Sequence, residues 1–148
     1  MNNICYNEGR IKSKIGEAYM QACKFTITTA VDEKENTVTY DGKIDVGETM
    51  VVLTYDEGAS QICITLQKGI AFIDRQGDYS LRLHLEEGKT KESGLGIGGS
   101  EGNILTKTHR VKYSFANNIF KLSLCYDLIF MEGEAQRMKL NLKAQIKG

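Results

Sequence analysis

The chain has 148 residues, 41% of them hydrophobic and 26% charged, which fits one globular domain with a complete core and excludes global disorder. Nineteen basic residues balance nineteen acidic ones, so the overall field expected of a nucleic-acid or membrane binder is absent and self-association is favoured. No run approaches the roughly 18 apolar residues of a membrane span, and residues 1–14 lack the apolar core of a secretory signal.

The four cysteines (Cys5, Cys23, Cys63 and Cys125) have none of the short spacings that a metal site needs. We therefore expect reduced thiols, no metal, no cofactor and a cytoplasmic location.

Residues 1–22 are expected to form an extension ahead of the main domain, which spans residues 23–148. Ile11, Ile15, Ala18 and Tyr19 fall close to helical spacing, which favours a short amphipathic helix. A frayed leader is the alternative.

Alternation of apolar and polar residues dominates the rest of the chain and predicts β-strands. The predicted strands cover 24–31, 37–46, 50–56, 61–66, 70–75, 79–86, 103–115, 119–131 and 137–146. Turn residues such as Lys68-Gly69 and Asn117-Asn118 separate them. Connections this short cannot make parallel crossovers, so the sheet is expected to be antiparallel and up-and-down.

We predict an all-β fold in which about eight to ten strands close into a barrel. An open sheet of this size would expose two long edges, and the chain has no proline to guard them. The apolar side chains are expected to point into the barrel.

The stretch Gly94–Gly99 matches the GxGxxG pattern of dinucleotide-binding loops. That function requires a helix directly after the glycines, whereas a β-pattern follows here, so we expect a mobile glycine-rich connection. His84 and His109 have no Cys, Asp or Glu nearby at the spacing of metal ligands, and neither belongs to an evident catalytic triad. An enzymatic function is therefore not favoured.

A polar segment interrupts the inward apolar pattern at Thr106–Arg110. Continued alternation would aim Lys107 and His109 inward, whereas a β-bulge would re-aim Thr106, Thr108 and Arg110. Arg75 lies just before a turn and shares the alternation of Ala71 and Ile73, so it falls on the apolar face of its strand. We take Arg75, Thr106, Thr108 and Arg110 as candidate polar anchors at the barrel mouth, where a cation fits the acidic head of a ligand. Side chains that simply reach water are the alternative.

The C-terminal third is locally cationic, with eight basic residues against three acidic ones in 103–148. Lys112, Lys121, Arg137, Lys139 and Lys143 are expected on the outer face of the last strands. Such a face could contact phosphate or RNA, but a solvated surface is favoured over an RNA-binding one, because the aromatic side chains alternate onto the opposite face.

From Phe25 onward the chain resembles the YwiB-like family of uncharacterised small bacterial proteins. The similar segments are the strand 25–31, Leu53-Thr54-Tyr55-Asp56-Glu57, Ile73-Asp74-Arg75-Gln76-Gly77, the strand 102–108, and the hairpin with Cys125-Tyr126-Asp127. The resemblance implies a calycin-like β-barrel and carries no activity or functional residues.

A closed barrel of this size either packs solid or holds one small ligand. We expect it to bind a small apolar or amphipathic ligand in its lumen. The alternative is a protein-interaction or oligomerising module whose outer surface does the work.

Overall fold

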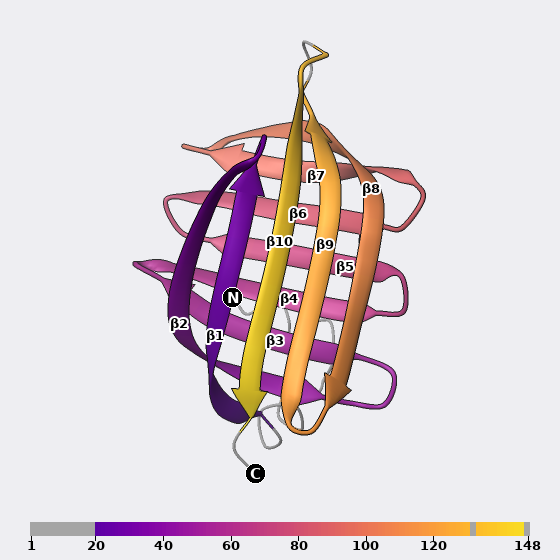
Figure 1. Ribbon diagram of the computed structural model, residues 1–148. Coiled ribbons are helices and arrows are strands. Elements are labelled where there is room, and N and C mark those ends of the chain that lie inside the picture. Colours follow the sequence, from indigo (N-terminus) through magenta and orange to yellow (C-terminus); the bar gives the residue numbers. More distant parts are fainter. Residues whose placement is uncertain (1–19, 131–132, 147–148) are drawn as a thin grey trace.

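The computed structural model describes residues 20–130 and 133–146. Ten β-strands make up the regular structure of this part of the chain (Figure 1). They are β1 (Gln21–Val31), β2 (Lys34–Val46), β3 (Val51–Glu57), β4 (Ser60–Gln67), β5 (Ile70–Gln76), β6 (Tyr79–Glu86), β7 (Thr90–Ile97), β8 (Ser100–Ala116), β9 (Ile119–Ile129) and β10 (Ala135–Ile146).

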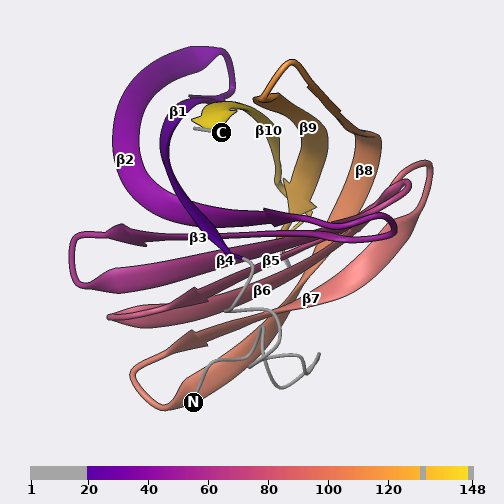
Figure 2. The same cartoon turned by 90° about the horizontal axis from the view of Figure 1, so that it is seen from below.

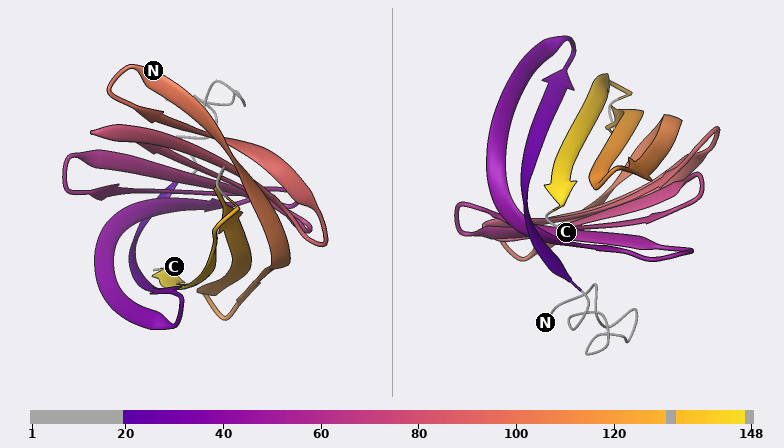
Figure 3. Two further views of the ribbon diagram at one scale, coloured as in Figure 1. Left: turned by 90° about the horizontal axis from the view of Figure 1, so that it is seen from above. Right: turned by 60° about the horizontal axis from the view of Figure 1, so that its bottom comes forward.

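Each strand pairs antiparallel with the next one along the chain, and β1 pairs with β10 to close the ring. The closed, up-and-down antiparallel barrel predicted from the alternation is therefore confirmed. The barrel is flattened: β3 to β7 form one layer, and β1, β9 and β10 cross it at a steep angle (Figures 1, 2 and 3). The long strands β2 and β8 bend from one layer into the other.

Alternate side chains fill the interior, as the sequence pattern predicts. On β9, Phe120, Leu122, Leu124 and Tyr126 are all buried, and their neighbours Lys121 and Ser123 face outward. The same pattern on the other strands gives one continuous core.

The glycine-rich stretch differs from its prediction. Gly94 and Gly96 lie within β7, and Gly98 and Gly99 form the tight turn into β8 with φ values of 56° and 86°. The strand was missed because glycine carries no side chain, so the alternation that marks a strand cannot be read there. A strand rather than a helix follows the glycines, which is inconsistent with a dinucleotide loop.

The helix expected over residues 1–22 lies almost wholly outside the described residues. Its last two positions, Gln21 and Ala22, belong to β1.

The described cysteines lie in strands and are buried. Cys23 and Cys125 are free thiols, and burial raises the pKa of Cys23 to about 11. Cys63 is disulfide-bonded, so the expectation of reduced thiols is wrong for this residue and holds for Cys23 and Cys125.

Candidate functional site

Unequal strand lengths leave one corner of the barrel open. β8 has 17 residues and β7 has 8, and the ladder between them ends where Lys107 faces Thr90. The backbone of the next residue, Thr108, bonds to the turn between β6 and β7. Its carbonyl oxygen accepts from the N–H of Gly88 at 2.9 Å, and its N–H donates to the carbonyl oxygen of Lys89 at 3.0 Å. From Val111 to Ala116, β8 pairs only with β9 among the described strands.

The unpaired half of β8 faces the turns 47–50, 68–69 and 87–89, which lie on its side of the molecule (Figure 1). A cavity of about 880 Å³ occupies this position, which we call the open corner. Its lining combines apolar side chains of Ile70, Val111 and Tyr113 with polar residues from the turns. The polar lining residues are Glu48, Thr49, Lys68, Glu86, Glu87 and Lys112.

Charges around the open corner are nearly balanced. Lys89 donates to the carboxylate of Glu86 at 2.9 Å, and this bond lowers the pKa of Glu86. Glu87 accepts from the backbone N–H of Val111 and from the ammonium of Lys112, both at 3.4 Å. The site therefore offers an apolar wall with a rim of both charge signs, which suits an amphipathic molecule.

The middle of the lumen is packed with side chains. Phe25 and Phe120 have no exposed surface, and Leu124, Tyr126 and Leu140 are at most 9% exposed. A ligand in the centre of this barrel would have to displace them.

Arg75 lies near the end of β5, and the β5–β6 turn that follows is at the other end of the strands from the turns that line the open corner (Figure 1). Its guanidinium donates to Glu57, to Ser60 Oγ at 2.9 Å and to Asp78 at 3.5 Å, and lies 4.4 Å from the ring centroid of Tyr79. Burial alone would lower the pKa of Arg75, but these partners raise it. The side chain is 15% exposed and ties two turns to β5 and β6, so it already has a structural role.

The other three candidate anchors lie on β8, where a β-bulge shifts the register between Thr108 and Arg110. Thr106 and Thr108 point inward and are at most 1% exposed, whereas Lys107, His109 and Arg110 are exposed. Arg110 lies on the outer face and donates to Ser123 Oγ at 3.3 Å. The structure thus brings Thr106 and Thr108 together and places Arg75 and Arg110 elsewhere, while a ligand role for any of them remains a prediction.

Both histidines have structural neighbours. His84 stacks on Phe72 with ring centroids 4.5 Å apart, and burial lowers its pKa. His109 Nε2 lies 2.9 Å from Asp127, which also accepts from Arg137. Within residues 20–130 and 133–146, no three His, Cys, Asp or Glu side chains are grouped as metal ligands.

The described residues form no helix that is long and apolar enough to cross a membrane.

Comparison with known proteins agrees with this architecture. A family model described as "Domain of unknown function (DUF1934)" matches residues 22–142. The crystal structure of the ywiB protein from Bacillus subtilis superposes with a TM-score of 0.72 at 12% sequence identity, over 88% of this chain and 94% of that one. No curated protein matches the sequence.

Proposed function

Because this chain belongs to the DUF1934 family, whose description names no activity, we propose its function from geometry: it binds a small amphipathic ligand at the open corner. The observation that carries the proposal is the cavity of about 880 Å³ beside the unpaired half of β8, which falls in the size range of small-molecule sites.

The position of this cavity suits entry from solvent to an apolar wall. Val111 is only 2% exposed and continues into the core, whereas Thr49 and Lys68 on the turns are exposed. A ligand tail would lie against Ile70, Val111 and Tyr113, and its head group would remain at the charged rim.

Thr108 lies next to the cavity lining on β8, and its hydroxyl group favours a ligand with a polar group. It is the inward-facing residue of β8 before Val111, and its buried Oγ1 has no hydrogen-bond partner among the described residues. Burying such a group without a partner costs about 1–3 kcal/mol, and a ligand that reached it would recover that cost.

The test uses dodecanoate and dodecylamine as probes of opposite head-group charge, with binding followed by calorimetry on the full chain. We expect saturable binding of at least one probe and a tenfold or greater loss of affinity in Thr49→Trp, which fills the cavity from an exposed turn. Ala59→Trp, on an exposed turn near the opposite corner, is the matched control and should stay within twofold of the parent. Absence of saturable binding, or equal affinity in both variants, would contradict the proposal.

The unpaired edge also supports a second candidate function, self-association through β8. Val111–Ala116 offers a strand edge to another chain, and Phe115 beside it is 44% exposed. Sedimentation equilibrium should then show a dimer that Phe115→Lys dissociates. A monomer at all concentrations would exclude this candidate.

A further inference from the structure

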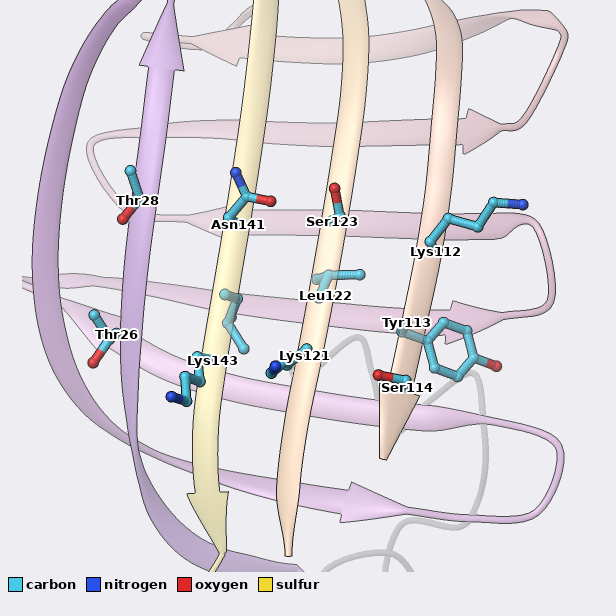
Figure 4. Close-up of a pocket in the computed structure, with 11 residues that line it drawn as sticks. Thr26, Thr28, Lys112, Tyr113, Ser114, Lys121, Leu122, Ser123, Asn141 and Lys143 are labelled. Atoms are coloured by element: carbon cyan, nitrogen blue, oxygen red, sulfur yellow. The ribbon is translucent and has the colours of Figure 1, made fainter. Parts of the chain in front are cut away.

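A hollow on the outer face of the barrel is lined by three lysines, two of which have no acidic partner among the described residues. Two rows of outward side chains cross β1, β10, β9 and β8 (Figure 4). In register, the first row is Thr28, Asn141, Ser123 and Lys112, and the second is Thr26, Lys143, Lys121 and Ser114.

Side-chain size explains why the surface is hollowed there. The inward partners Leu122 and Leu142 are each 2% exposed and hold the strands on the core. Short hydroxyl side chains such as Thr26 and Ser123 lie beside longer lysines, so a groove of about 510 Å³ remains. We call it the outer lysine groove, and it is separate from the open corner, although Lys112 and Tyr113 on β8 border both.

The charge of the groove is of one sign. Its lining contains three lysines and no acidic residue. Lys112 is paired with Glu87, but Lys121 and Lys143 make no ion pair with any described residue. Arg110 adds a further cation at the edge through its hydrogen bond to Ser123.

Lys121 and Lys143 stand directly opposite each other on β9 and β10. Like charges in such a cross-strand pair destabilise a sheet. An anion bound between the two ammonium groups would remove this repulsion, and the neighbouring hydroxyl and amide groups would donate hydrogen bonds to its oxygens.

We propose that the outer lysine groove binds a small ligand carrying two or more linked phosphate groups, held between Lys121 and Lys143. Several linked phosphates match the two unpaired lysines and the polar row beside them better than one phosphate does, because a single group reaches fewer donors. Lysine suits this ligand as a point charge that needs no fixed geometry.

Isothermal titration calorimetry on the full chain in about 20 mM salt tests the proposal, since low salt leaves surface charges unscreened. The probes are inorganic tripolyphosphate, a nucleoside triphosphate and orthophosphate. We expect one-to-one binding of tripolyphosphate, at least tenfold weaker binding of orthophosphate, and loss of affinity in high salt. Equal affinity for the nucleoside triphosphate would assign the contact to the phosphates alone, and tighter binding would assign a nucleotide.

Matched variants separate this groove from general charge. Lys121→Gln with Lys143→Gln should weaken tripolyphosphate binding at least tenfold, and Lys121→Arg with Lys143→Arg should retain it. Lys34→Gln with Lys43→Gln removes the same charge from exposed positions on β2 and should change affinity by less than twofold. No binding to the parent, equal weakening in both glutamine pairs, or binding of a single-stranded oligonucleotide alone would overturn the proposal. Alkyl-probe binding at the open corner is unaffected by either result, so the two proposals fail independently.

Discussion

Thr106 and Thr108 occupy successive inward positions on β8, yet their hydroxyl groups differ in hydrogen bonding. Thr106 Oγ1 donates to the carbonyl oxygen of His84 at 2.6 Å and lies 3.4 Å from Ser93 Oγ. Thr108 Oγ1 is buried without a partner among the described residues. The same substitution should therefore have opposite effects at the two positions.

We predict that Thr108→Val raises the free energy of unfolding by about 1 kcal/mol, because it removes a buried group that makes no hydrogen bond. Thr106→Val should lower it by about 1–2 kcal/mol, because the bonded carbonyl of His84 loses its partner. Urea unfolding followed by circular dichroism measures both. Equal losses in the two variants would mean that the Thr108 hydroxyl is satisfied, for example by an internal water.

Asp127 gives a pH-dependent prediction. The hydrogen bond from Arg137 lowers the pKa of Asp127, and the bond from His109 acts in the same direction. A carboxyl whose pKa is depressed by folding stabilises the protein above its unfolded pKa of about 3.9, and this contribution is lost as the pH falls through the folded value.

Asp127→Asn should therefore lower the free energy of unfolding by about 1 kcal/mol at pH 7, and the difference from the parent should shrink as the pH falls below about 4. Thermal unfolding between pH 7 and pH 2.5 measures it. Asp41→Asn is the control, since the Asp41–Lys24 pair is 84% and 70% exposed and is expected to contribute less than about 0.5 kcal/mol. A gap that stays constant with pH would contradict the assigned ionisation.

The β9–β10 hairpin combines a well-packed inner face with an outer face that opposes its own charges. Phe120, Leu122 and Leu142 are at most 2% exposed on the inner face, whereas Lys121 faces Lys143 outside. The inner face holds the hairpin on the core, so the repulsion outside is tolerated and can be removed without changing the fold.

Lys143→Glu should raise the free energy of unfolding by about 0.5 kcal/mol, because an opposite-charge pair replaces a like-charge pair across the strands. Chemical unfolding in low salt measures the gain, and about 1 M salt should remove most of it. A gain that persists in high salt would point to packing rather than charge.

The strands that pattern could predict are those whose side chains alternate. β9 and β10 follow directly from rows such as Phe120 to Tyr126, because side-chain direction reverses at every residue of a strand. β7 was missed because Gly94 and Gly96 have no side chain to report a face. The bulge at Thr108 was anticipated as one of two alternatives, and only the register could decide between them.

The candidate sites depend on features that local sequence does not encode. Arg75 is held by Glu57, Ser60 and Asp78 from two different turns. Its structural role could not be predicted from local sequence, because these partners come together only in the folded chain. The open corner exists because β8 runs past the end of β7, and the missed glycine strand hid this difference in length. The outer lysines were identified from sequence, but the groove between them arises from cross-strand register.

The pairing of β1 with β10 closes the barrel and joins strands from the two ends of the sequence. Nine of the ten strand pairings join consecutive strands, and the tenth joins Cys23 to Ile146 and Val31 to Met138. Because the first and last strands are neighbours, the start of β1 lies beside the end of β10 (Figure 3). The ring of strands is therefore continuous, and any turn between two neighbouring strands could in principle carry the chain ends.

A circular permutant should therefore fold to the same barrel. Residue 148 would be joined directly to residue 1, and new ends would be opened between Gly98 and Gly99. Both glycines are exposed, and each has open space around its α-carbon, so charged ends there meet no core contact. We expect the parent circular dichroism spectrum and a free energy of unfolding lower by about 1–3 kcal/mol, since the turn no longer restricts β7 against β8.

The control permutant opens between Thr106 and Lys107, inside β8, where Thr106 is fully buried, and it should not fold. Equal behaviour of the two permutants, or failure of the first, would show that the ring does not have the connectivity described.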